Sequence, residues 1–268
     1  MAVGLLVVGL GYVAFYSFLE FDPYHILIYQ FTLSNYAQIS TNPAYLTILG
    51  RTLSLSLLVS FSSILLGFVF AYVTVRAGRS LVQKFLLVSL FVPFFTGDIV
   101  RVFGWLVILG KNGLLSGLSK QVLGFPIDLI YTQTAVVIGL TQVMLPLAVL
   151  MIIPALTSIR RDLEYAAMNL GASQFRTMIH IVLPLSKPGL VAAFITTFTI
   201  SATSFAEPDL LGGGLSDFSA NAIFNFMFNA AAYPLAAATS VVLTIVISVL
   251  VFLVLKRVGP GTLTYVKK

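Results

Sequence analysis

Cysteine is absent from the 268 residues, and charged side chains make up only 9% of them. Without thiols, the chain can form no disulfide, no thiolate nucleophile and no cysteine-ligated metal site. The two histidines, His25 and His180, are far apart in the sequence, so we expect no metal site. A soluble domain carries about 25% charged residues, and the low charge therefore excludes an ordinary soluble domain.

Sequence patterns for nucleotide binding and for covalent catalysis are also missing. The one Gly-Lys pair, Gly110-Lys111, is followed by Asn112 and has no glycine pattern of the G-x-x-x-x-G-K-[ST] type before it. No Ser/His/Asp arrangement and no pair of catalytic acids in a soluble pocket is evident. We therefore predict that the chain is not an enzyme, does not bind ATP and carries no cofactor of its own.

Long apolar stretches dominate the chain, which is 59% hydrophobic with a mean hydropathy of +1.02. A helix needs about 20 apolar residues to cross a bilayer. Six stretches reach that length, near residues 1–19, 48–75, 82–109, 131–157, 189–207 and 233–256. We predict an all-α, polytopic integral membrane protein with about six transmembrane helices in a single domain, 1–268. The first stretch lacks the flanks of a cleaved signal, and we interpret it as a retained helix.

The lysines and arginines predict how the chain is oriented in the membrane. Most of them fall in the loops on one side of the predicted membrane: Arg76, Arg79, Lys84, Arg160, Arg161, Arg176, Lys187, Lys256, Arg257, Lys267 and Lys268. The loops on the other side hold only Lys111 and Lys120, and Arg51 and Arg101 lie in or beside spans. The positive-inside rule makes the side with most of these residues cytoplasmic. We therefore predict a multi-pass protein of the cell membrane, and an even number of spans, six, puts both of its termini on the cytoplasmic side. The net charge of +6 follows this topology and does not indicate nucleic-acid binding.

A polar island over about residues 160–186 interrupts the apolar runs on the predicted cytoplasmic side. Gly171 predicts a helix stop or a sharp bend, and Pro184 and Pro188 break the chain before the next apolar run. Residues at three- and four-residue spacing share one helical face: Leu163, Ala166, Ala167 and Leu170. Small alanines on that face allow a partner surface to approach closely. The plainer interpretation is an ordinary cytoplasmic loop with a surface helix.

The island carries the spacing A-A-x3-G-x9-I-x-L-P, which resembles the cytoplasmic "EAA" loop of permease subunits from binding-protein-dependent ABC importers. The resemblance implies a short helix that docks into a groove on a separate ATPase subunit. It assigns this coupling role to Glu164, Tyr165, Ala166, Ala167, Leu170, Gly171, Ile181, Leu183 and Pro184. One departure is that the family's glutamate directly before the alanines is Tyr165 here. Glu164, one residue earlier, is the candidate to substitute for it.

Further blocks resemble permeases of the polyamine type, the spermidine/putrescine family of type I importers. They are residues 31–56, 92–113, 206–214 and 234–246. The resemblance implies a second homologous permease subunit, two copies of an ATPase that binds ATP and Mg²⁺, and an extracytoplasmic solute-binding protein. With the lipid bilayer, these are the expected partners.

Charged residues within the third predicted span are candidates for the solute pathway, because charges inside a membrane are costly and usually face a cavity or each other. Asp98 and Arg101 are three residues apart on one helical face, so they either neutralise each other or leave Asp98 free to attract an amine. Pro93 and Gly97 interrupt the same span. Trp105 is either an interfacial belt residue or a contact for an alkylammonium group.

Two acids, Glu207 and Asp209, follow the fifth predicted span. They are either the start of an interfacial loop or a second acidic site at the entrance. Acids outnumber lysines in the outer loops, and a negative outer face suits a cation. The resemblance to polyamine-type permeases implies a polyamine, such as spermidine or putrescine, as the imported solute.

Other functions stay open at this stage. Within the same class, the solute could be opine-like, another organic cation or an anion, and the second permease could be identical or different. A secondary transporter driven by an ion gradient would need coupling carboxylates in its spans, where Asp98 is the only clear one. A membrane scaffold without transport activity would leave the spacing of the loop motif unexplained.

Overall fold

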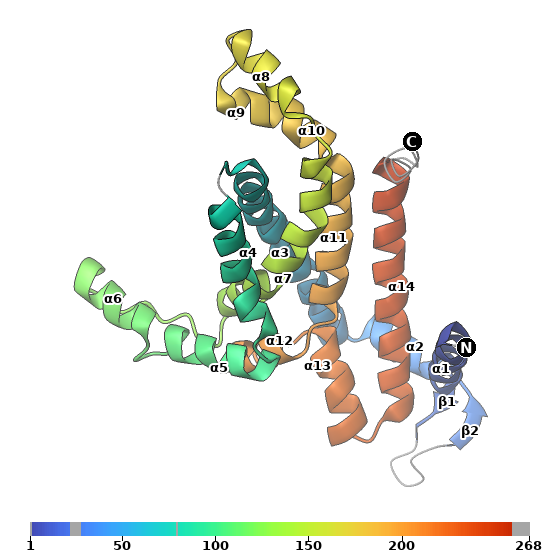
Figure 1. Cartoon of the computed structure of the whole chain (residues 1–268). Helices are drawn as coiled ribbons and strands as arrows, with labels where there is room; N and C mark the ends of the chain where they lie inside the picture. The colour runs from blue at the N-terminus through green and yellow to red at the C-terminus, as the bar shows by residue number, and fades with distance from the viewer. Residues whose placement is uncertain (1, 22–27, 79, 259–268) are drawn as a thin grey trace.

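The computed structural model describes residues 2–21, 28–78 and 80–258 (Figure 1). His25, Arg79, Lys267 and Lys268, used in the sequence argument, lie outside these residues. Apart from a small antiparallel pair, β1 (Leu19–Glu20) and β2 (Ile28–Phe31), the regular structure is helical, as predicted. The helices are α1 (Ala2–Tyr16), α2 (Ser34–Thr41), α3 (Pro43–Arg76), α4 (Ser80–Phe95), α5 (Asp98–Leu109), α6 (Leu114–Leu123), α7 (Gln133–Thr157), α8 (Arg161–Asn169), α9 (Gln174–Thr177), the π-helical η1 (Met178–Val182), α10 (Leu183–Leu185), α11 (Lys187–Ala202), α12 (Ala206–Gly212), α13 (Ser219–Phe224), the π-helical η2 (Asn225–Asn229) and α14 (Tyr233–Val258).

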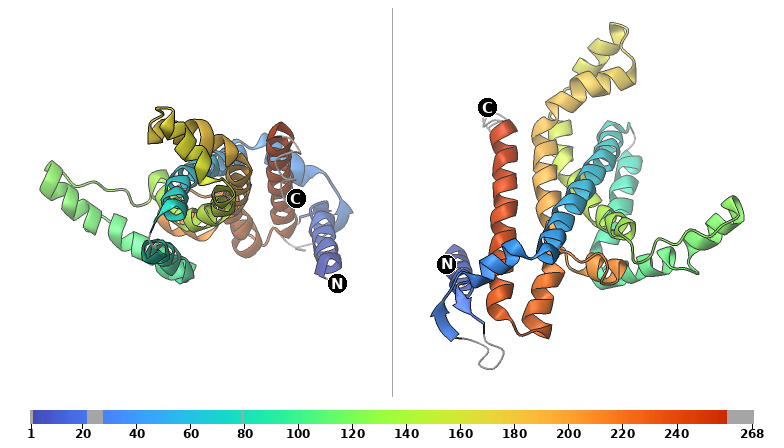
Figure 2. Two further views of the ribbon diagram at one scale, coloured as in Figure 1. Left: turned by 45° about the horizontal axis from the view of Figure 1, so that its top comes forward. Right: turned by 180° about the vertical axis from the view of Figure 1, so that it is seen from behind.

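Helices α3, α7 and α11 form the central bundle, and Figure 2 shows α3 crossing the other two obliquely. Small residues let their backbones approach closely, which is how helices associate where lipid removes most of the hydrophobic driving force. A Cβ added to Gly189 of α11 would lie 2.6 Å from the Cβ of Ala155 in α7. One added to Gly67 of α3 would lie 3.1 Å from the Cβ of Ala148 in the same helix α7.

Four of the six predicted spans correspond to long apolar helices or to part of a bent pair. Among the described residues, the stretches Pro43–Arg76, Asp98–Val122, Gln133–Thr157 and Tyr233–Arg257 are long and apolar enough to cross a membrane. A fifth is formed if the helices on either side of a 71° bend at Ser186 count as one span. The shorter apolar helices α1 and α4 occupy the positions of the first and third predicted spans.

The span predicted over 82–109 is divided into two helices at the interruption expected from Pro93 and Gly97. Helix α4 ends at Phe95, and α5 begins at Asp98 and runs away from the bundle (Figure 1). Pro93 lacks a backbone N–H and weakens the last turn of α4. Gly97 then takes an extended conformation (φ −58°, ψ 147°) at the start of α5. The predicted fifth span also ends early, at Ala202, so Glu207 and Asp209 lie on the separate helix α12.

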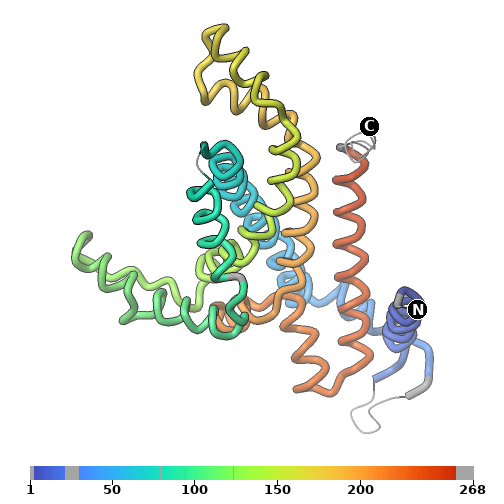
Figure 3. Tube along the Cα trace, in the orientation of Figure 1, coloured from blue at the N-terminus to red at the C-terminus, as the bar shows by residue number. Residues whose placement is uncertain are grey.

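Helices α8, α9 and η1 form a hairpin that stands beyond one end of the bundle, the end where α14 also finishes. The Cα trace shows α3 running from the level of α13 to the end that carries this hairpin (Figure 3). The helical hairpin and the segments around α12 and α13 therefore lie at opposite ends of α3.

The close approach of α11 to α7 can be tested with a single methyl group. Gly189→Ala must push the two backbones apart, because the new Cβ would also lie 3.1 Å from the carbonyl oxygen of Met151. We expect a loss of about 1–3 kcal/mol, typical of overpacking, seen as a lower Tm of the purified protein. Gly50→Ala is the matched control, since its Cβ meets nothing within 4 Å. Equal Tm values for the two variants would contradict the packing argument.

Candidate functional site

The predicted coupling loop is a helical hairpin with a sharp turn at Gly171. Helix α8 ends there because Gly171 adopts φ +87°, the left-handed region that favours glycine. The N–H groups of Gly171 and Ala172 each donate to a carbonyl of the last turn, at Met168 and Ala167, over 3.0 Å. This is the Schellman pattern of helix termination. The predicted helix stop is confirmed.

One face of the hairpin is apolar and open. Leu163 is 46% exposed and Leu170 is 89% exposed, with Ala166 exposed between them and Ala167 half-buried. Tyr165 is also exposed, at 55%. The second arm of the hairpin exposes Phe175 and Ile179, and α10, which follows it, exposes Leu183 and Pro184. Ile181 is half-buried.

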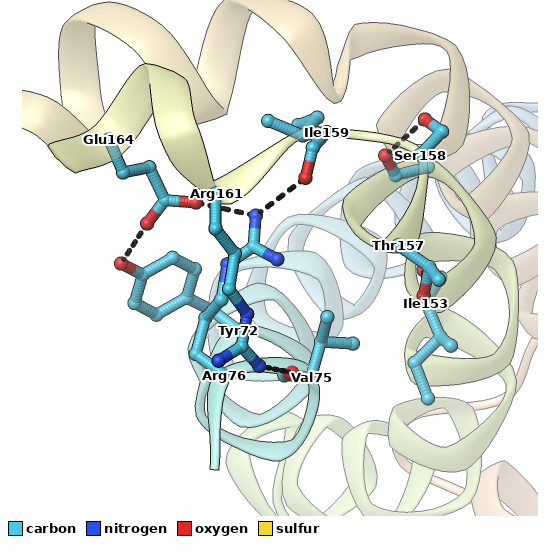
Figure 4. Close-up of polar contacts among 10 residues, drawn as sticks. Tyr72, Val75, Arg76, Ile153, Thr157, Ser158, Ile159, Arg161 and Glu164 are labelled. Carbon is cyan, nitrogen blue, oxygen red and sulfur yellow. Dashed lines mark hydrogen bonds and ion pairs between the residues drawn. The ribbon is translucent and has the colours of Figure 1, made fainter. Parts of the chain in front are cut away.

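Glu164 points the opposite way, into the protein (Figure 4). Glu164 is only 6% exposed. Its Oε1 lies 2.5 Å from a terminal nitrogen of Arg76, and its Oε2 accepts a hydrogen bond of 2.8 Å from the hydroxyl of Tyr72. Arg76 and Tyr72 both belong to the last turns of α3. Glu164 is therefore buried while the next residue, Tyr165, faces outward, and the Glu164 carboxylate bonds α8 to α3.

Two hydrogen bonds to backbone carbonyls strengthen the same junction. Arg76 donates to the carbonyl of Ile159 over 3.2 Å, and Arg161 donates to the carbonyl of Val75 over 2.9 Å. Both appear in Figure 4. In contrast, the ion pair between Arg160 and Asp162 is largely exposed, with side chains 80% and 72% accessible. Surface pairs of that kind contribute little to stability.

The predicted intramembrane charges form a second cluster at the break between α4 and α5. Arg101 is 9% exposed and makes an ion pair with Asp98, whose side chain is 74% exposed. The other terminal nitrogen of Arg101 donates to the carbonyl of Pro93 over 3.3 Å, so Arg101 spans the break. The ion pair considered from the sequence is confirmed, and it leaves the Asp98 carboxylate open on its outer side.

Glu207 joins this cluster, while Asp209 does not. Helix α12 packs against both α5 and α7, which buries Glu207 to 6% exposure beside Gly139. Burial raises the pKa of the Glu207 carboxyl; of the neighbouring charges, Asp98 raises this pKa and Arg101 lowers it. Asp209 on the same helix is exposed.

Trp105 has a packing role in the structure. It is half-buried against the core, and its Nε1 donates to the side-chain oxygen of Gln142 over 3.3 Å. This bond links α5 to α7. Within the described part of the chain, no group of three or more His, Asp or Glu side chains could hold a metal ion.

Contacts at the end of α3 away from the hairpin were not predicted from the sequence. Arg51 donates to the carbonyl of Leu215 over 2.9 Å, and the hydroxyl of Thr52 accepts from the backbone N–H of Ser219 over 2.8 Å. Burial and the neighbouring charge of Asp209 raise the pKa of Asp217 in the same loop, and Arg51 opposes that rise. Arg51 was the only sequence signal, as a cation at the edge of a span.

In comparisons with known proteins, the chain matches one family model and is similar to several permease proteins. The family described as "Binding-protein-dependent transport system inner membrane component" matches residues 63–263. The spermidine/putrescine transport system permease protein PotB of Salmonella typhimurium is 33% identical over 239 residues, covering 88% of this chain and 83% of the relative. The protein of the same name from Escherichia coli K12 is 32% identical over 236 residues, covering 87% and 85%.

Solved structures support the fold. A bacterial alginate ABC transporter, in complex with an alginate-bound periplasmic protein, aligns with a TM-score of 0.76 at 14% identity, covering 96% of this chain and 88% of that one. The MetNI methionine ABC transporter aligns with a TM-score of 0.57 at 19% identity, covering 79% and 93%. The family match spans more than half of the chain, and the identity to relatives extends over most of it. The chain therefore belongs to the family of binding-protein-dependent transport system inner membrane components, the permease subunits of ABC importers.

Proposed function

We propose that this permease subunit moves a polyamine, such as spermidine or putrescine, inward across the cell membrane, driven by ATP hydrolysis on a separate ATPase. The observation that carries the proposal is the hairpin of α8 and α9, which presents an apolar face beyond the end of a membrane bundle. The relatives named as spermidine/putrescine permeases support the choice of solute.

The exposed face of the hairpin suits a docking surface for the ATPase. Exposed apolar surface of this kind marks a contact with another protein. Ala166 leaves room for close approach, and Leu163 and Leu170 supply apolar area on either side of it. Exposed cations rim the hairpin, at Arg160, Arg161 and Arg176, so an ATPase groove with acidic edges fits best.

The assembly that we propose contains this chain, a second homologous permease, two ATPase copies that bind ATP and Mg²⁺, and an extracytoplasmic solute-binding protein. The hairpin end would face the cytoplasm, in agreement with the bias of lysine and arginine toward these loops. The described part of α14 finishes at the same end (Figure 1). Closure of the ATPase pair would move the hairpin because the ATPase contacts differ between its two states.

The cluster of Asp98, Arg101 and Glu207 supports a cationic solute. The Asp98 carboxylate is 74% exposed beside the buried Arg101 guanidinium, so a solute could reach it. Glu207 is buried on α12, and its burial favours the uncharged carboxyl. An ammonium group that approached Asp98 would be attracted by the exposed carboxylate.

Docking through the hairpin predicts that Gly171→Asp separates the permease from its ATPase. A side chain at φ +87° costs about 1–2 kcal/mol, and the added carboxylate would also enter the docking groove. We expect loss of ATPase co-purification with the tagged permease and at least a tenfold fall in spermidine uptake.

The control for this variant is Gly214→Asp, which places the same side chain at φ +76° in open space at the outer end. We expect the control to retain the ATPase. Normal co-purification and normal uptake with Gly171→Asp would count against docking at the hairpin.

The charge cluster predicts that Asp98→Asn weakens uptake of a cationic solute without loss of assembly. Removing the open carboxylate should raise the KM for spermidine about tenfold, equivalent to about 1.4 kcal/mol. Asp128→Asn is the control, since Asp128 is an exposed acid in an outer loop. Uptake kinetics in membrane vesicles decide the matter, and unchanged kinetics in Asp98→Asn would rule out a role in the solute pathway.

A further inference from the structure

Helix α3 is a long, unbroken connection between the two ends of the molecule. It has 34 residues and contains proline only at its first position. At 1.5 Å per residue, it is about 50 Å long. The neighbouring helices are less continuous, because α7 contains Pro146 and Pro154 and α11 is separated from α10 by the 71° bend.

The inner end of α3 is bonded to the coupling helix through Tyr72, Arg76 and Glu164, which we call the inner latch. The side chains of Arg76 and Glu164 are only 14% and 8% exposed. Water and salt therefore screen this ion pair far less than the exposed pair of Arg160 and Asp162. The backbones of α3 and α8 do not pack closely, so side chains make the connection. A displacement of α8 would therefore reach α3 through the inner latch and through the bond from Arg161 to the Val75 carbonyl.

The outer end of α3 is bonded to the segment that follows α12. Thr52 and Ser219 are 0% and 2% exposed, and their hydroxyls lie 3.2 Å apart in addition to the bond from the Ser219 N–H. Arg51 holds the Leu215 carbonyl one residue earlier on α3. We call these contacts the outer anchor. They fix the end of the loop that leaves α12, the helix that carries Glu207.

We propose that α3 transmits the movement of the docked hairpin to the solute pathway. The inner latch makes α3 follow α8, and the outer anchor makes the loop after α12 follow α3. The inference rests on the proposed function, since the movement originates in the ATPase. Glu164, Arg76 and Tyr72 are positioning residues here: they contact neither solute nor nucleotide, and they act by making α3 follow α8.

The absence of cysteine makes the test direct, because introduced cysteines are the only labelling sites in this chain. Spin labels at Leu215→Cys and Gln133→Cys report the distance between the outer segment and the start of α7, and both residues are exposed. The distance is measured by pulsed electron paramagnetic resonance in the complete complex, with and without a non-hydrolysable ATP analogue. We expect a nucleotide-dependent change in the otherwise unmodified protein.

The decisive variant combines Glu164→Ala with Arg76→Ala, which removes the inner latch without leaving either charge buried and unpaired. We expect this variant to retain the ATPase, because the docking face is unchanged, and to show a smaller nucleotide-dependent change at the outer end, since only the bond from Arg161 to Val75 still joins α8 to α3 there. Asp162→Asn is the matched control on the same helix and should behave as the unmodified protein does. Persistence of the full change in the double variant would overturn the proposal.

Two further variants keep the test decisive. If the double variant fails to assemble, Tyr72→Phe removes one hydroxyl from the inner latch, and a reduced change supports the proposal while an undiminished one overturns it. At the outer anchor, Thr52→Val should also suppress the change, whereas Thr47→Val should not, because the Thr47 hydroxyl donates to the Pro43 carbonyl within α3 itself. No response to nucleotide in the unmodified complex would instead contradict the proposed function itself.

Discussion

The structure depends on the close packing of small residues between α3, α7 and α11. In lipid, apolar side chains gain little by turning inward, so helices associate through tight contact and through satisfied polar groups. Gly67 of α3 approaches Ala148 of α7, and Gly189 of α11 approaches Ala155 of the same helix. Because these helices are held together, the hairpin beyond the bundle and the charge cluster at the α4–α5 break keep defined positions relative to α3.

Two of the buried charged side chains lie at junctions between helices, and each has compensating contacts. Glu164 is held by Arg76 and Tyr72 where α8 meets α3. Arg101 is held by Asp98 and the carbonyl of Pro93 where α4 gives way to α5. The first arrangement joins two helices and the second stabilises a broken one. This difference is why we assign transmission to the first and contact with a cation to the second.

Much of the fold and of the hairpin could be predicted from the sequence. Apolar length identified α3, α7 and α14, and the three- and four-residue spacing correctly placed Leu163 and Leu170 on an exposed face. The inward direction of Glu164 could not be predicted, because its hydrogen-bond partner Tyr72 lies 92 residues away. The break after Phe95 was signalled by Pro93 and Gly97, but hydropathy alone could not separate a kinked span from two helices.

The most direct measurement of the central claim is a photo-crosslink from Leu170, the most exposed of the apolar residues on the hairpin, carried out in intact membranes. The account predicts a single crosslinked product that contains the ATPase subunit, with none from a crosslinker at Leu215, which is exposed at the opposite end. A crosslinker at Leu170 that captured no ATPase, or labelling of position 170 by a membrane-impermeant reagent added outside the cell, would contradict it.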